Sequence, residues 1–197
     1  MKKINRRTFL GATAQAATAA TLFHIVPNHV LGGVAHAAPS EKLNIAGIGV
    51  GGMGASNLRN LNSQNIVALC DVDSEYAAKT FQEYPDAVTY KDYRVMLEKQ
   101  KDIDAVLIAT PDHTHAVIAM AAIQAGKHVY CQKPLTHKVF ESRKLAEAAK
   151  TTGISTQMGI QGHSGRDARQ VCEWIAAGAI GKVREVQTWC SLTYYPW

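Results

Sequence analysis

Five glycines, the first of them Gly47, lie where the first strongly apolar stretch of the sequence ends. Gly49, Gly51 and Gly54 stand at G-x-G-x-x-G spacing, with Gly52 and Met53 between the last two. In such a turn the first glycine permits the tight bend, the second lets the backbone approach a pyrophosphate, and the third allows helix and strand to pack closely. The N–H groups at the start of the next helix then face the phosphates. The pattern predicts dinucleotide binding.

A carboxylate about twenty residues later supports this prediction. Glycine-rich turns are common, so the spacing alone is weak, but residues 65–71 form a second apolar run that ends in Asp71. A carboxylate there bonds the adenosine ribose hydroxyls and repels the extra phosphate of NADP. The alternative is that Asp71 only caps the next helix, although Asp73 or Ser74 fits that role equally well. We therefore expect NAD as cofactor, with NADP disfavoured.

A lysine follows another apolar run. Lys133 comes just after residues 128–131 and precedes Pro134, which fixes the local backbone. A lysine held at such a turn can hydrogen-bond a hydroxyl that is losing its hydride. A solvated surface lysine is an equally good interpretation of its position alone. Lys133 is the predicted catalytic residue.

Histidines near the same crevice have weaker claims. His113 and His115 lie at the start of a predicted helix, where capping or packing against the nucleotide is favoured over proton transfer. His137 and His163 lie in positions from which they could reach a substrate. No third ligand stands at a persuasive spacing from His113 and His115, so no metal site is predicted. No serine occupies a nucleophile elbow, which leaves acyl transfer without support.

The elements that must position these residues alternate along the chain. Strands are predicted at 43–48, 65–71, 87–90, 103–109, 128–131 and 154–158, and helices at 55–61, 74–83, 93–100, 113–125 and 138–152. A last helix begins at Ser164 or Asp167 and runs to about residue 177. This alternation predicts an α/β fold, a Rossmann doubly wound parallel sheet with right-handed crossovers.

Ligands of such sheets bind beyond the carboxyl ends of the strands. The segments that follow the predicted strands should therefore converge on one crevice. The predicted cofactor-binding residues are Gly49, Gly51, Gly52, Met53, Gly54, Asp71, Thr110, Pro111, His113, His115, Gln132, Lys133 and Gln161.

The first 37 residues have the features of an export signal. Residues 5–10 contain a twin-arginine signature, a mildly apolar stretch follows, and residues 35–37 offer a small-x-small cleavage site. The apolar stretch is too interrupted to predict a stable membrane anchor. We expect twin-arginine (Tat) export to the periplasm or the medium.

The leader also accounts for most of the net charge. Four of the 21 basic residues lie in it and none of the 16 acidic ones, so the net charge falls from +5 to +1 without it. No basic run or aromatic-interleaved patch remains, and a nucleic-acid partner is not expected.

The predicted domains are a signal peptide over 1–37, the Rossmann domain over 38–160 and the truncated start of an α/β C-terminal substrate domain over 161–197. Residues 183–190 alternate like a half-exposed strand, and aromatic residues with nothing to pack against follow. This pattern predicts an N-terminal fragment of a longer protein. The four cysteines lack C-x-x-C spacing, and no disulfide framework is expected.

These motifs together resemble the glucose–fructose oxidoreductase / inositol dehydrogenase (Gfo/Idh/MocA) family. The resemblance covers residues 41–197 and rests on the segments 43–54, 110–115, 126–129 and 132–134. It implies NAD(P)-dependent oxidation or reduction of a sugar, inositol or related polyol. It also implies that Lys133 matches the lysine of the family's E-K-P motif, and that homo-oligomers form only in the full-length protein. Secreted members of the family carry their cofactor through the Tat pathway already bound.

Two residues depart from the family pattern. Gln132 stands where Glu is usual, and Asp112 stands where Asn is frequent. The family's downstream catalytic aspartate and histidine would lie beyond Trp197. Two other functions stay open: an NAD-dependent glycoside hydrolase of the same superfamily, and a nucleotide-binding module that is inactive without its second domain.

Overall fold

The computed structural model describes Ala38 and residues 41–189. The predicted signal peptide and the closing aromatic residues therefore lie outside the described residues. The chain divides into two units, Met1–Lys42 and Leu43–Trp197. All elements described below belong to the second unit.

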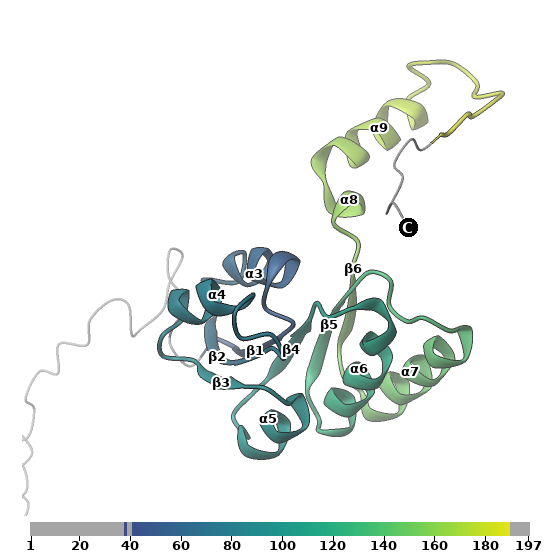
Figure 1. Ribbon diagram of the computed structural model, residues 1–197. Helices are drawn as coiled ribbons and strands as arrows, with labels where there is room; N and C mark the ends of the chain where they lie inside the picture. Colours follow the sequence, from purple (N-terminus) through teal and green to yellow (C-terminus); the bar gives the residue numbers. More distant parts are fainter. Residues whose placement is uncertain (1–37, 39–40, 190–197) are drawn as a thin grey trace, which may run out of the picture. The chain divides into compact units, whose positions relative to one another are not determined.

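Six parallel strands form a single sheet in the order β3-β2-β1-β4-β5-β6 (Figure 1). The strands are β1 (Asn44–Ile48), β2 (Asn65–Cys70), β3 (Val88–Tyr90), β4 (Ala105–Ile108), β5 (His128–Gln132) and β6 (Thr156–Gly159). This strand order is that of the Rossmann fold. Strands are added toward one edge of the sheet from β1 to β3 and toward the other edge from β4 to β6, so the strand order reverses between β1 and β4. The predicted fold class is confirmed, and each predicted strand from residue 43 to residue 159 is present.

Helices cover the sheet in two layers (Figure 1). Leu58 of α3 (Gly52–Arg59) and Phe81 of α4 (Ala78–Glu83) pack in one apolar cluster with Leu69 and Leu107 of the sheet. The second cluster, on the other face, joins strand residues to α5 (Tyr93–Lys99), α6 (His115–Gln124) and α7 (Val139–Thr152). Each large side chain that is fully buried, such as Leu58 or Ile108, contributes about 1.5–3 kcal/mol.

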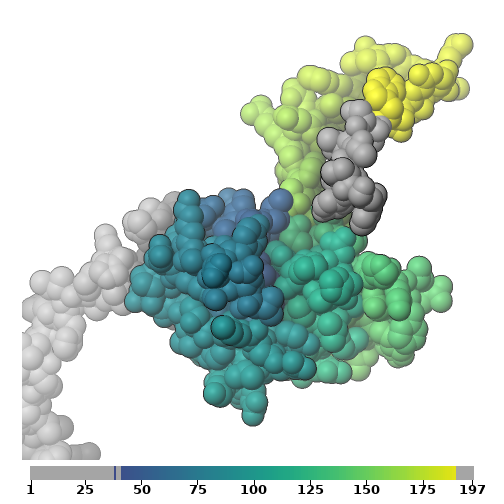
Figure 2. All heavy atoms as spheres, viewed as in Figure 1, coloured from purple at the N-terminus to yellow at the C-terminus, as the bar shows by residue number. Residues whose placement is uncertain are grey.

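The second cluster spans both halves of the sheet, from β2 to β5. In the space-filling view the blue-to-teal atoms of the first half and the green atoms of the second accordingly form one continuous body (Figure 2). Loops at the carboxyl ends of β1, β2, β4 and β5 are therefore held on one rigid base.

Local hydrogen bonds set several helix ends. The Asp92 carboxylate accepts the N–H of Arg94 and caps the start of α5. Glu141 accepts the N–H groups of His137 and Lys138 at the start of α7. Gly153 ends α7 with a φ of 70°, a left-handed conformation that glycine adopts without a steric cost.

The helix predicted over 74–83 begins later than expected, at Ala78. Asp73 accepts the N–H groups of Glu75 and Tyr76, at 3.1 and 2.9 Å, and closes a turn instead of capping the helix. A short 3₁₀ helix, η2 (Asp112–Thr114), likewise precedes α6.

After β6 the chain forms α8 (Gln161–Ser164) and α9 (Arg166–Ala176). The strand predicted over 183–190 is wrong where it can be checked, because residues 183–189 form no strand and are exposed. A strand needs a neighbour for its backbone hydrogen bonds, and every paired strand within residues 41–189 already belongs to the six-stranded sheet.

Cys70, Cys131 and Cys172 are free thiols, while Cys190 lies outside the described residues. Across the residues that the structure describes, no helix combines the length and the apolar character needed to cross a membrane.

Candidate functional site

The glycine turn connects β1 directly to α3. Gly49 has a φ of 75° and Gly52 a φ of 42°, both in the region that disfavours other residues. The helix begins at Gly52, inside the glycine pattern and three residues before its predicted start. The first N–H groups of α3 therefore belong to the turn itself, where an anion can use them.

The turn has no room for side chains. A Cβ on Gly54 would stand 1.9 Å from the carbonyl oxygen of Gly49, and one on Gly49 would stand 2.7 Å from the backbone of Ala109. Both obstacles are backbone atoms, which cannot rotate away. The close approach of α3 to the strands thus depends on glycine at these positions, as the sequence pattern predicts.

Asp71 holds the turn from the end of β2. One carboxylate oxygen, Oδ2, accepts the N–H of Val50 at 2.8 Å and that of Gly51 at 3.3 Å. The other, Oδ1, accepts the N–H of Asp73 at 3.0 Å. The carboxylate therefore binds the glycine turn and does not cap α4. It remains partly exposed, which leaves it accessible to a ligand.

Two residues that the sequence did not single out support the same turn. The hydroxyl of Thr80, buried on α4, donates to the carbonyl oxygen of Val50 at 2.7 Å. The ring of Tyr76 lies against the turn, since a Cβ on Gly51 would come within 2.2 Å of it. No local sequence pattern indicates the first contact, because Thr80 and Val50 are 30 residues apart.

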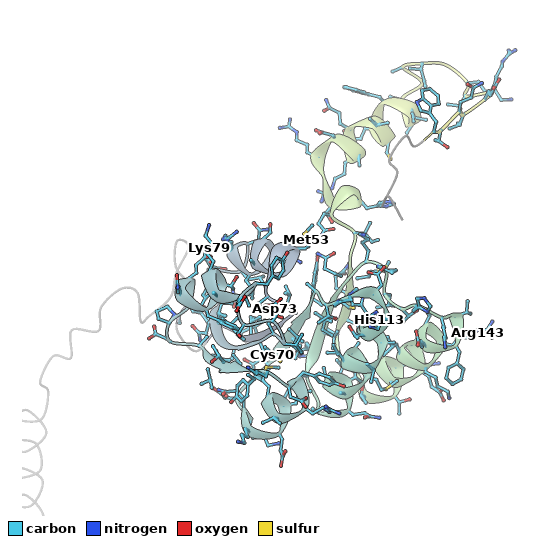
Figure 3. All side chains as sticks on the ribbon, in the orientation of Figure 1. Met53, Cys70, Asp73, Lys79, His113 and Arg143 are labelled. Carbon is cyan, nitrogen blue, oxygen red and sulfur yellow. The ribbon has the colours of Figure 1, made fainter. Side chains whose placement is uncertain are left out.

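A cavity of about 510 Å³ opens beside Asp71. It lies at the carboxyl ends of β1, β2 and β4, and its volume suits a nucleotide-sized ligand. Figure 3 labels three of its lining residues: Cys70 and Asp73, from the end of β2 and the loop after it, and His113, from the segment after β4. The lining comprises Ile48, Gly49, Gly51, Cys70, Asp71, Val72, Asp73, Tyr76, Lys91, Tyr93, Ala109, Thr110, Pro111, His113, Thr114, Val117 and Ile118.

The structure brings together six of the predicted site residues in this lining: Gly49, Gly51, Asp71, Thr110, Pro111 and His113. Gly52, Met53 and Gly54 lie in the adjoining first turn of α3, where Met53 is exposed and Gly54 is buried. The lining residues Val72, Lys91, Tyr93 and Val117 were missed, because they are ordinary residues whose role comes only from their place in the fold.

Other predicted residues do not line this cavity. Lys133 is exposed in the loop after β5, and its N–H donates to Oε1 of Gln132 at 3.2 Å. Gln132 is buried, and its Nε2 has no hydrogen-bond partner. Gln161 lines a separate cavity of about 310 Å³, beside Tyr130 and Asn57.

His115 lies beneath the surface and is only 1 % exposed. Its Nδ1 is 2.6 Å from the carbonyl oxygen of Pro134, and its Nε2 is 2.8 Å from that of Thr110. Both ring nitrogens are thus engaged by backbone atoms and are not turned to the cavity.

Burial raises the pKa of the Cys70 thiol to about 12, and the neighbouring Asp71 carboxylate adds to the effect. A thiol with this pKa is protonated at neutral pH and is a poor nucleophile. Its place in the cavity wall is therefore that of a small apolar group. No cluster of three or more His, Cys, Asp or Glu residues suited to a metal occurs within the described part of the chain.

The site therefore fits a dinucleotide on observations of its own. The turn has no room for a Cβ, no side chain caps the first N–H groups of α3, and the Asp71 carboxylate binds the N–H groups of Val50 and Gly51 beside them. The fold and the site together define a dinucleotide-binding domain of the Rossmann class.

Comparison with known proteins gives the family. The chain belongs to the Gfo/Idh/MocA family, described as an oxidoreductase family with an NAD-binding Rossmann fold, whose family model matches residues 43–160. The family that the sequence motifs resemble is thus confirmed.

Among its relatives, the inositol 2-dehydrogenase of Salmonella paratyphi B is 30 % identical over 141 residues, which are 68 % of this chain and 42 % of the relative. The inositol 2-dehydrogenase of Pseudarthrobacter chlorophenolicus is 36 % identical over 152 residues, or 75 % of this chain and 43 % of the relative. The solved structure of myo-inositol 2-dehydrogenase from Lactobacillus plantarum matches with a TM-score of 0.67 at 28 % identity, covering 72 % of this chain and 43 % of that one. The chain thus spans less than half the length of these relatives.

Proposed function

We propose that this chain binds NAD in the cavity beside Asp71 and serves an oxidoreductase that acts on a sugar, inositol or related polyol. The observation that carries the proposal is the pair of hydrogen bonds from Val50 and Gly51 to the Asp71 carboxylate. They fix the acidic group and the glycine turn together at the edge of a cavity of nucleotide size. The inositol dehydrogenases among the relatives support the substrate class.

The residues divide the work of binding as follows. The N–H groups at the start of α3 would hold the pyrophosphate, and Asp71 would accept hydrogen bonds from the adenosine ribose hydroxyls. When bound, NAD supplies a hydride acceptor. The ammonium group of Lys133 would donate a hydrogen bond to the substrate hydroxyl and stabilise negative charge that develops on its oxygen.

NAD is preferred over NADP in this proposal. A 2′-phosphate on the adenosine ribose would stand beside the negative charge of Asp71, and the nearby Asp73 is also acidic. Calorimetric titration of the chain with each cofactor tests the preference. We expect tighter binding of NAD and a reduced difference in Asp71→Ser, and equal affinities in the wild type would refute the preference.

A turnover assay tests the role of Lys133. In a protein that carries this domain together with a substrate domain, Lys133→Ala should lower the turnover of a polyol on the order of 10²-fold if the lysine assists proton transfer. Net NADH formation with substrate is the expected signal of a dehydrogenase. An undiminished rate in Lys133→Ala would assign the lysine a structural role.

We also propose export through the twin-arginine pathway, on the basis of Arg6 and Arg7 and the small-x-small site at 35–37. Replacing both arginines by lysine should leave the protein in the cytoplasm of a host with a functional Tat system. Fractionation followed by immunoblotting would show this, and unchanged export of the lysine variant would contradict the proposal.

A further inference from the structure

His115 is the one buried histidine of the site, and it touches two backbone carbonyl groups. Nδ1 lies 2.6 Å from the oxygen of Pro134, and Nε2 lies 2.8 Å from the oxygen of Thr110. With 1 % of its surface exposed, the ring has no access to bulk water that could replace either contact. Both distances are those of well-formed hydrogen bonds.

A carbonyl oxygen can only accept a hydrogen bond, so each ring nitrogen must donate one. A neutral imidazole carries a single N–H and leaves a lone pair on its other nitrogen. In that form one of the two short contacts would set a lone pair against a carbonyl oxygen in a buried place, which is unfavourable. The protonated ring has two N–H groups and satisfies both contacts.

The two carbonyls belong to different loops of the same sheet edge. Thr110 follows β4 and lines the cavity, whereas Pro134 follows β5 and is joined directly to Lys133. The ring is carried by the first residue of α6, which packs in the apolar cluster with both strands. The two nitrogens of the rigid His115 ring therefore set the spacing between the loop at Thr110 and the loop at Pro134.

We propose that His115 is a positioning residue, held as an imidazolium ion, that ties the cavity wall at Thr110 to the loop carrying Lys133. In this role it touches neither cofactor nor substrate. The consequence for binding rests on the proposed function, because it assumes that the nicotinamide half of NAD reaches the backbone of the loop that carries Lys133. The protonation state of the ring does not depend on that assumption.

Nitrogen-15 NMR of ring-labelled histidine tests the protonation state in the cofactor-free chain at neutral pH. We expect His115 to show two protonated ring nitrogens whose N–H hydrogens exchange slowly with water. Assignment through the backbone of His115 and Ala116 avoids dependence on a variant that fails to fold. One protonated and one bare nitrogen would overturn the proposal.

Binding tests the positioning role. The variant His115→Gln keeps one side-chain N–H donor near the ring position but places an acceptor at the other, so it can serve only one carbonyl. We expect its affinity for NAD to fall on the order of tenfold, the effect of losing one buried hydrogen bond. Its affinity for AMP, which lacks the nicotinamide half, should stay within about twofold of the wild type.

A matched control is His128→Gln, at the opposite end of β5. His128 is exposed, and its Nδ1 accepts the N–H of Ser155. This variant should bind both ligands as the wild type does. Equal losses of NAD and AMP affinity in His115→Gln, or no loss of either, would refute the positioning role. If the wild type bound neither ligand, the proposed function would fail, and the ring signals would still decide between the imidazolium and the neutral ring.

Discussion

The two ends of the binding edge differ in how completely the described chain builds them. At the end formed by the loops after β1 and β2, backbone N–H groups, Asp71 and Thr80 are joined by hydrogen bonds around a cavity. At the end formed by the segments after β5 and β6, Lys133 and Gln161 are exposed, and neither lines the cavity beside Asp71. The first end is organised for binding before any ligand arrives.

The difference has a physical origin. The hydrogen bonds that join Asp71 and Thr80 to the glycine turn all lie within residues 49–80, and two helices pack directly behind it. The second end depends on Lys133, a long flexible side chain that needs further contacts to hold one position. It follows that cofactor affinity and catalysis should respond to different substitutions.

Gly54→Val should have the largest effect on the first end. Its Cβ would overlap the carbonyl oxygen of Gly49 at 1.9 Å, so α3 must move away from the turn. We expect a loss of stability of about 2 kcal/mol and no measurable NAD binding. Chemical denaturation and calorimetry provide the two measurements.

Gly162→Ala is the control for that substitution. A Cβ at Gly162 meets no atom within 4 Å. Stability and NAD affinity should both match the wild type. Similar losses in the two variants would show that the crowding at Gly54 has no special importance.

Asp71→Ala should have the next largest effect. It removes the acceptor of three backbone N–H groups, those of Val50, Gly51 and Asp73, and the partner of the ribose hydroxyls. NAD affinity should fall by about 10- to 100-fold, the loss of one or two charge-assisted hydrogen bonds. AMP should lose affinity in parallel, because the lost contacts belong to its half of the cofactor, and an unchanged AMP affinity would contradict this.

The buried thiols of Cys70 and Cys131 should make the stability of the fold depend on pH in the alkaline range. Burial raises the pKa of Cys70 and of Cys131 from 9.0 to about 12. The unfolded thiols ionise first, so this contribution to stability is complete below about pH 9 and is lost as the pH rises toward 12. The denaturant concentration at the unfolding midpoint should therefore decrease as the pH is raised from about 9 to about 11. The decrease should be smaller in Cys70→Ala and in Cys131→Ala.

Thiol labelling separates the same two residues. At pH 8 the exposed Cys172 should react first, and both buried thiols should react slowly. Added NAD should slow Cys70, which lines the cavity, more than Cys131, which does not. Equal protection of both would argue against a ligand confined to the first end.

Lys133→Ala should have the smallest effect on cofactor affinity. The side chain is exposed and lies outside the cavity lining, so NAD binding should change by less than about twofold. A loss as large as that of Asp71→Ala would show that the Lys133 side chain itself, and not only the loop that carries it, contributes to cofactor binding.

Much of the fold follows from local patterns in the sequence. Apolar runs such as 43–48 and 103–109 predict buried strands, and Gly126 and Gly153 mark helix ends, with φ values of 75° and 70°. The start of α4 was predicted too early because Asp73 uses its carboxylate to close a turn at Glu75 and Tyr76, and the Tyr76 ring lies against the glycines. The strand expected over 183–190 failed because alternation alone cannot supply a neighbouring strand.

The site was predictable where spacing determines geometry. Gly49, Gly51 and Asp71 were identified from a motif, since the turn, the helix start and the next strand end have fixed separations in this fold. Thr80 and Tyr76 were missed because Thr80 reaches the turn from α4 and Tyr76 reaches it from the residues just before α4, and no local pattern encodes that packing. The engagement of both His115 nitrogens likewise required the three-dimensional arrangement of two loops.

Backbone amide NMR during titration with NAD tests the central claim most directly. We expect the largest shifts in residues 49–54, 71–76 and 110–114, the segments around the cavity of about 510 Å³. Shifts at the opposite edge, around Asn65, Asp86 and Asp102, or no shifts at saturating NAD, would contradict it.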